Sequence, residues 1–226
     1  MPHDEASRFV PDRAVERLQF GLPDRGFVFC CFNAAYKFNP DVFRSWMRLL
    51  AAIDGSVLWL AEVNATAEAN LRKLAAAAGI DPHRLVFAQR LPSATDHLAR
   101  LKLADLFLDT WPYNAHTTAG DALWVGLPVL TRIGETFAGR AAASMLTGIG
   151  LAELIVESTE QFESMANELA AEPSRLAEIK YKLARNRLAT PLFDTKRYIG
   201  YLKTAYAAMH LRSREGLRPE HIHVAS

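Results

Sequence analysis

The sequence predicts an α/β fold in which a parallel sheet of about six strands is covered by helices on both sides. Short, continuously apolar segments of strand length alternate with longer segments in which apolar residues recur at helical spacing. The connections between these segments are short. Strands in such an alternation run parallel, because a helix crosses over between one strand and the next.

The predicted strands are apolar runs, which are typical of strands buried on both faces of a sheet. The first is GFVFCCF, residues 26–32, and it holds both cysteines of the chain, Cys30 and Cys31. Neighbouring residues of a strand point to opposite faces, so these two thiols are poorly placed to pair with each other. The other strands are expected in SVLWLAE, RLVFAQ, DLFLDT, PVLT and LAELIV.

The predicted helices are bounded by residues typical of helix ends. Asn39-Pro40-Asp41 combines a capping residue, a proline for the first helical position and an acid in the first turn. Gly79 and Gly126 stand where two later helices should stop. Helices are expected over residues 65–78, 94–104, 117–125 and 138–146, and only helices from 159 to about 209.

The chain is predicted to form one domain with short extensions. Residues 1–19 are a polar lead-in, residues 20–210 form the domain with its C-terminal helices, and residues 211–226 are a polar tail. A short helix is expected from Arg13 to Leu22, across the first boundary. The amino terminus lacks the pattern of a signal peptide. No stretch reaches the roughly 20 apolar residues that span a membrane.

The composition favours a globular protein and argues against several partners. Half of the residues are hydrophobic and 23% are charged, so the chain can build a core. The formal net charge is +1, which argues against nucleic acid or an anionic membrane as the main partner. Cysteines that are not expected to pair fit a reducing, cytoplasmic setting.

The segment DTWPYNAHTTAGDALWVG, residues 109–126, carries the strongest functional signal. His116, Thr117 and Thr118 stand where a helix should begin, just after a predicted strand. A helix start offers unpaired N–H groups and a partial positive charge, which together favour phosphate. Asp121, one turn further on, suits hydroxyl groups such as a ribose diol. The alternative is that Thr117 only caps the helix and His116 only packs.

Two further segments follow strands and are expected at the same edge of the sheet. FNAAYKFNP, residues 32–40, brings Lys37 to a strand end as a counter-ion for a diphosphate, and the alternative is a solvated loop lysine. LPSATDHLARLKLAD, residues 91–105, puts His97 and Arg100 on one helix face, a pair that by itself is typical of a surface.

The motifs of several other chemistries are absent from the sequence. It contains no G-x-G-x-x-G after the first strand, no P-loop, no H-E-x-x-H, no paired C-x-x-C and no G-x-S-x-G. It also lacks an acidic D-x-D pair that would hold a metal beside a diphosphate. We therefore expect a phosphate site that needs neither a metal nor another cofactor.

These segments resemble the carboxyl-terminal half of the catalytic region of the protein O-GlcNAc transferase and SPINDLY-like family. The resemblance runs from about Phe20 to Met209. It implies a Rossmann-like lobe of a two-lobed, GT-B type glycosyltransferase that binds a nucleotide-sugar donor without metal. The segments that carry it are GFVFCCFNAAYK, SVLWL, LADLFLDTWPYNAHTTAGDALWVGLPVLT, GETFAGRAAASML and TPLFDTKRY.

The resemblance also implies roles for the residues singled out above. It implies that Lys37 contacts the diphosphate and is needed for catalysis. The helix-start residues would hold the phosphates, the acid one turn on would bind the ribose, and two residues of segment 91–105 would flank the uracil. The phosphates are assigned to His116, Thr117 and Thr118, and the ribose to Asp121. The uracil is assigned to His97 and Arg100.

Two positions depart from the pattern of the vertebrate members of that family. Ala34 stands where they have a glutamine, and Ser93 stands where they have a second, ribose-contacting lysine. Either change would weaken donor binding or alter the sugar. The family's other catalytic lobe is expected before residue 20, where this sequence has only the lead-in.

Two hypotheses about function stay open. In the first, the chain is the UDP-sugar-binding lobe of a protein O-glycosyltransferase, which transfers a sugar to Ser or Thr when a protein partner or a second copy supplies the acceptor side. In the second, it is a non-catalytic nucleotide-binding or scaffolding relic of such an enzyme. If the other lobe is missing, Trp111, Pro112 and Tyr113 should form an exposed apolar strip.

Overall fold

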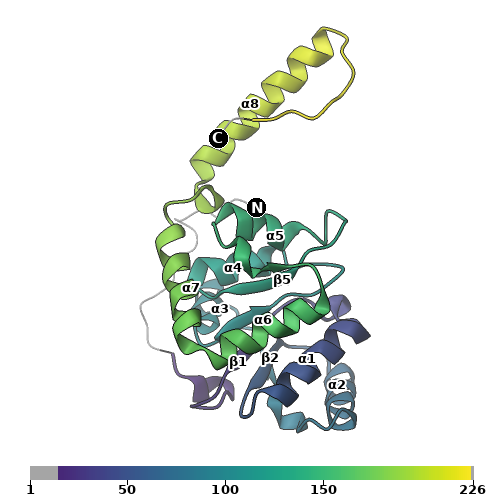
Figure 1. The fold of residues 1–226 in the computed structure, drawn as a ribbon, viewed down its shortest axis with the longest axis vertical. Helices are drawn as coiled ribbons and strands as arrows, with labels where there is room; N and C mark the ends of the chain where they lie inside the picture. The colour runs from purple at the N-terminus through teal and green to yellow at the C-terminus, as the bar shows by residue number, and fades with distance from the viewer. Residues whose placement is uncertain (1–14, 225–226) are drawn as a thin grey trace.

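A parallel sheet of six strands forms the centre of the fold, in the order β3-β2-β1-β4-β5-β6 (Figure 1). The structure is a computed structural model, and it describes residues 15–224. Every neighbouring pair of strands is parallel, which confirms the predicted fold class. The strands are β1 (Val28–Cys31), β2 (Val57–Ala61), β3 (Leu85–Ala88), β4 (Leu106–Leu108), β5 (Val129–Arg132) and β6 (Ile155–Val156).

Helices cover the sheet in two rows. The chain steps one way along the sheet from β1 to β3 and the other way from β4 to β6, so right-handed crossovers put the connecting helices on opposite faces. Helix α6 packs beside α1, while α4 contacts both α3 and α5 in the other row (Figure 1). The helices of these rows are α1 (Pro40–Ala52), α2 (Ala65–Ala77), α3 (Ala94–Leu101), α4 (Thr117–Val125), α5 (Ala141–Gly148) and α6 (Thr159–Ala171).

Two further helices end the chain. Helix α7 (Pro173–Asn186) packs against α6, whereas α8 (Thr195–Arg214) extends away from the body of the molecule (Figure 1). Helix α8 contains no buried residue and continues past residue 210, where the predicted domain ends. Among the described residues, no helix is both long and apolar enough to cross a membrane.

The core lies on both faces of β1, as its apolar sequence predicts. All four residues of β1 are buried, and Cys30 and Cys31 are free thiols, as expected for neighbours on opposite faces. Burial raises the pKa of both thiols, because a thiolate cannot be solvated there. Both cysteines therefore act as small apolar core residues.

Some predicted helix boundaries are wrong. The helix predicted over 138–146 begins only at Ala141, because the preceding residues form a turn in which Gly139 N–H donates to Thr136 O at 3.0 Å. The helix predicted over 94–104 ends at Leu101. Of the short helix predicted from Arg13 to Leu22, the described residues form only a 3-10 turn, η2 (Arg17–Phe20). Residues 1–14, most of the predicted lead-in, lie outside the described residues.

The side chain of Asn39 caps α1 and also links it to the loop after β4. Asn39 Oδ1 accepts the N–H groups of Asp41 and Val42 at 3.0 Å each, and the Asn39 amide donates to the carbonyl of Trp111, in the loop after β4. We expect Asn39→Ala to lower the free energy of unfolding by about 1–2 kcal/mol, the upper part of the range for a lost cap, because it also removes this link. Urea denaturation measures the loss.

The matched control is Asn64→Ala. Asn64 caps α2 by accepting the N–H of Ala67 at 2.8 Å, so it supports only its own segment. We expect a smaller loss there, of about 1 kcal/mol or less. Equal losses in the two variants would contradict a structural role for the Asn39–Trp111 link.

Candidate functional site

The candidate site lies at the carboxyl ends of β1 and β4, the two central strands. The chain leaves β1 toward β2 and leaves β4 toward β5, so the loops that follow these strands diverge. Such a switch point leaves a crevice, and ligands of doubly wound sheets bind there. The two loops are residues 32–39, which contain Lys37, and residues 109–116, which end at His116 just before α4.

Lys37 reaches from the first of these loops to the second. It ends a 3-10 turn, η3 (Ala35–Lys37), and its Nζ donates to the backbone carbonyl of Asn114 at 2.7 Å. The same ammonium lies 4.0 Å from the centre of the Tyr113 ring. Partial burial lowers the pKa of Lys37, whereas the charge of the Asp109 carboxylate acts to raise it. The lysine is therefore held in place and is not a solvated loop residue.

A buried carboxylate supports the second loop from beneath. Asp109 follows β4 directly and is 0% exposed. Its Oδ1 accepts the N–H groups of Thr110 at 2.7 Å and Ala115 at 2.6 Å, and its Oδ2 accepts the Thr131 hydroxyl at 2.7 Å. The Asn33 amide, in the first loop, donates to Oδ1 at 3.2 Å. Both loops of the crevice are thus tied to one side chain.

The start of α4 faces this crevice. His116 is the N-cap residue but makes no capping hydrogen bond with its side chain, so capping does not explain its presence. Thr117 is exposed, and the first N–H groups of α4 have no partner within the helix. The Thr118 hydroxyl donates to Asn33 Oδ1 at 2.6 Å, which joins the helix start to the loop after β1. Asp121 lies one turn into α4 and is partly buried.

A chain of aromatic rings borders Lys37. The Tyr36 and Tyr113 ring centres are 6.1 Å apart, those of Tyr113 and His116 are 5.3 Å apart, and those of His116 and Phe137 are 6.1 Å apart. Phe137 is 86% exposed, in the loop after β5, so three loops contribute to this border. Within the part of the chain that the structure describes, Nε2 of His116 is buried and has no hydrogen-bond partner. A ligand with an oxygen at that position would supply one.

The expectation of an exposed strip at Trp111, Pro112 and Tyr113 is correct only in part. Pro112 and Tyr113 are exposed, but Trp111 is only 7% exposed. Its ring packs edge-on against Phe162 of α6 at 5.0 Å, and the Arg132 guanidinium lies 5.6 Å from its centre. A helix remote in sequence therefore covers this residue.

The structure brings His97 and Arg100 to the loop after β1. Their helix, α3, passes beside Phe32, whose ring lies 5.7 Å from that of His97 and 5.0 Å from the Arg100 guanidinium. Arg100 is only 4% exposed, so this pair is not simply a surface feature. Arg100 donates to the carbonyl of Gln89 at 2.5 Å and lies 2.9 Å from His97 Nδ1. Because a guanidinium only donates, Nδ1 is the acceptor and the ring hydrogen of His97 resides on Nε2.

Sequence reasoning missed Asp109 and Asn33 as parts of the site. Both are polar and follow an apolar strand, Asp109 directly after β4 and Asn33 two residues after the end of β1. A polar residue that ends a fully buried strand must find partners inside the protein. That rule could have identified both residues from the sequence. In the structure, the hydrogen bond between Asn33 and Asp109 joins the two loops of the crevice.

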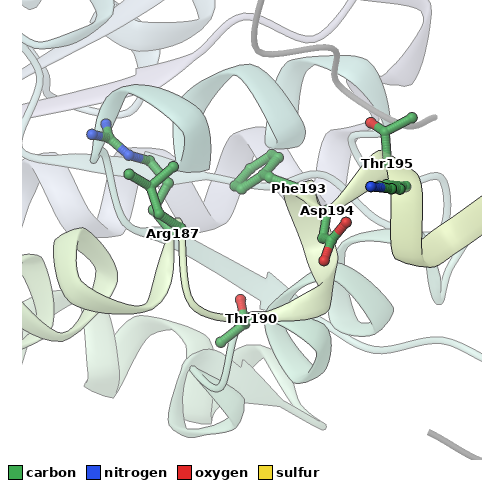
Figure 2. A pocket seen from close by; sticks show the side chains of 7 residues that line it. Arg187, Thr190, Phe193, Asp194 and Thr195 are labelled. Atoms are coloured by element: carbon green, nitrogen blue, oxygen red, sulfur yellow. The ribbon is translucent and has the colours of Figure 1, made fainter.

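A separate hollow of about 340 Å³ lies where α7 meets α8 (Figure 2). The Arg187 guanidinium lies 5.5 Å from the Trp124 ring, near the end of α4, whereas the candidate site lies at the start of that helix. None of the predicted site residues borders the hollow. Its lining residues are Arg187, Leu188, Thr190, Phe193, Asp194, Thr195 and Lys196.

The doubly wound sheet, with its crevice at the switch point, defines a Rossmann-like lobe of the kind found in GT-B glycosyltransferases. Residues 8–202 match the model of glycosyl transferase family 41. The chain belongs to this family, which confirms the resemblance seen in the sequence.

Individual relatives are similar over nearly the whole chain. It is 36% identical over 215 residues to the probable UDP-N-acetylglucosamine–peptide N-acetylglucosaminyltransferase SEC of Arabidopsis thaliana, covering 95% of this chain and 22% of that protein. It is 30% identical over 222 residues to the corresponding SPINDLY protein of rice, Oryza sativa subsp. japonica, covering 96% of this chain and 23% of that protein.

A solved structure is similar as well. A mutant O-GlcNAc transferase of Thermobaculum terrenum matches with a TM-score of 0.77 at 32% identity, covering 81% of this chain and 36% of that one. The chain thus spans less than a quarter of the length of those two plant relatives and just over a third of that solved chain.

Proposed function

We propose that this chain binds a UDP-sugar at the crevice between β1 and β4 and acts as the donor-binding lobe of a protein O-glycosyltransferase. The acceptor would be Ser or Thr of proteins, when the acceptor lobe is supplied. The names of the relatives support the donor and the reaction, because they describe UDP-N-acetylglucosamine–peptide N-acetylglucosaminyltransferases. The buried, unpaired cysteines favour a cytoplasmic setting.

One observation carries the proposal. The Lys37 ammonium is fixed against the Asn114 carbonyl, two residues before the N-cap residue of α4, so a positive side chain and a helix start share one crevice. A diphosphate between them would receive a charge-assisted hydrogen bond from Lys37 and N–H donors from Thr117 and Thr118. His116 Nε2 would gain the partner that it lacks among the described residues.

The nucleoside end of the donor would extend toward α3. The ring hydrogen on Nε2 of His97 offers a donor to a uracil carbonyl, and Arg100 holds that ring from behind through Nδ1. In this proposal Asp121 receives the ribose hydroxyls, since a carboxylate is an acceptor for hydroxyl groups. Arg100 supports the base site chiefly through His97, because its guanidinium is buried and its two terminal nitrogens are already bonded.

Calorimetric titration with UDP, UDP-GlcNAc, GDP and GDP-sugars tests the proposal. We expect the uridine nucleotides to bind and the guanosine nucleotides to bind more weakly, because the base would lie between His97 and the ribose site. Ser93 caps α3 by accepting the N–H of Asp96 at 3.2 Å, a role different from that of the ribose-contacting lysine expected there in the vertebrate members of the family. Absence of binding by all four ligands would overturn the proposal.

A second prediction concerns metal. We expect UDP affinity in a chelator to equal that in magnesium or manganese, because Lys37 and the N–H groups of α4 already provide positive charge for the diphosphate. Titrations in EDTA and in either metal ion measure this. An affinity that collapses in EDTA and returns with metal would show that a cation completes the site.

A further inference from the structure

Asp109 is the most buried charged group of the candidate site, and none of the contacts proposed for the donor uses it. Its carboxylate is 0% exposed and accepts hydrogen bonds from Thr110, Ala115, Asn33 and Thr131. Burying a carboxylate is costly, and here four donors offset part of that cost. The arrangement stays in place only if all four donors keep their positions around it.

The hydrogen bonds of Asp109 lead to the groups proposed to hold the diphosphate. Ala115, whose N–H it accepts, directly precedes the N-cap residue of α4. Asn33 connects it to the Thr118 hydroxyl, because the amide nitrogen donates to Asp109 and the amide oxygen accepts from Thr118. The turn that it holds, residues 110–116, also presents the Asn114 carbonyl that receives Lys37.

Asp109 also interacts with Lys37 through charge. Burial lowers the pKa of the lysine, and the Asp109 charge opposes that effect. The Tyr113 ring and the Cys31 thiol of β1 also lie near Lys37. Burial raises the pKa of Cys31, so it is a neutral thiol. Burial raises the pKa of Asp109 to about 6, and its hydrogen bonds with Thr131, Ala115, Thr110 and Asn33 act to lower it. At pH 7.5 the carboxylate is therefore mostly ionised.

We propose that Asp109 is the positioning residue of the diphosphate site: it holds the 110–116 turn and the Thr118 hydroxyl in place and supplies the buried negative charge that sustains the Lys37 ammonium. It does not touch the ligand. The proposal rests on the proposed function for the identity of the ligand, but its effect on Lys37 can be measured without one.

The first test compares two variants of aspartates that flank β4. Asp109→Asn keeps the shape and removes the charge at the carboxyl end of the strand. Asp105→Asn does the same at the amino end, where Asp105 accepts from Val28 N–H and pairs with Arg17, both within 3 Å. The control thus removes a well-bonded carboxylate at the opposite end of the same strand, remote from the crevice.

Two readouts are taken at the same time. Carbon-13 NMR of dimethylated lysines follows the titration of Lys37 without ligand, and calorimetry at pH 7.5 gives the dissociation constant of UDP. For Asp109→Asn we expect Lys37 to titrate at lower pH and the UDP dissociation constant to rise about tenfold, as for one misaligned hydrogen bond to a charged group. For Asp105→Asn we expect neither change, although its thermal stability falls.

The outcomes separate this inference from the proposed function. If the wild-type chain binds no UDP, the proposed function fails, while the Lys37 titration still decides whether Asp109 sustains that charge. A Lys37 titration unchanged in folded Asp109→Asn, or UDP affinity reduced equally by both variants, would overturn the inference.

If Asp109→Asn does not fold, Lys37→Met provides the reciprocal test, because coupling between two charges acts both ways. Asp109 should then take up its proton at higher pH than in the wild-type chain, and an unchanged titration would overturn the inference.

Discussion

A polypeptide of these 226 residues, incubated with UDP-GlcNAc and a library of Ser- and Thr-containing peptides, is expected to transfer no sugar above background. The described site holds groups for a diphosphate and a nucleoside, but in a two-lobed transferase the acceptor and any general base come largely from the opposite lobe. Alignment of two reactants can supply roughly 7–11 kcal/mol of the barrier. Slow hydrolysis of the donor is the most that we expect of the polypeptide alone.

Radiolabelled UDP-GlcNAc measures the transfer. Lys37→Ala is the matched control, because it removes the proposed diphosphate contact and should abolish any genuine signal. A second arm adds a separately produced acceptor lobe from a family member such as the Thermobaculum terrenum enzyme, and labelling that appears only then would support a donor role. Strong labelling by the 226-residue polypeptide alone, lost in Lys37→Ala, would show that it is self-sufficient.

Replacement of Lys37 by alanine is expected to weaken UDP binding by about 1.5–3 kcal/mol, the range for a hydrogen bond to a charged group. This corresponds to a rise of about 10- to 150-fold in the dissociation constant. The physical reason is that Lys37 is the side-chain cation fixed beside the start of α4, held by the Asn114 carbonyl and the Tyr113 ring. Its removal leaves the diphosphate with neutral donors.

The control for this variant is Lys73→Ala. Lys73 is an exposed lysine of α2, so its loss changes the net charge by the same amount at a distant surface. We expect its UDP affinity to match that of the wild-type chain at physiological salt, where charges separated by more than about 8 Å are screened. A dissociation constant unchanged in Lys37→Ala would remove Lys37 from the site.

The sequence alone predicts much of this fold, because its local patterns are unambiguous. The all-apolar run of β1, the Asn39 cap and Gly126 each determine a short segment, and the predicted helix over 117–125 agrees with α4. The start of α5 was missed because its turn depends on hydrogen bonds among residues 134–140 that propensity does not reveal. Burial of Trp111 was missed because its cover comes from α6.

The candidate site divides in the same way. Lys37 and the His116–Thr118 segment could be proposed from the sequence because each follows a predicted strand, and strand ends of a parallel sheet meet at one edge. Asp109 was missed because its significance lies in its bonds to Asn33 and Thr131, which are 76 and 22 residues away in the chain. Contacts of that kind require the strand order, which local periodicity does not provide.

A crystal structure of the chain with UDP tests the central claim most directly. We expect diphosphate oxygens within about 3.2 Å of Lys37 Nζ and of an N–H group at the start of α4. The uracil should lie beside His97. The assignment of the donor site would be contradicted if UDP at saturating concentration bound in the hollow lined by Arg187 and Lys196 (Figure 2) and not at the start of α4.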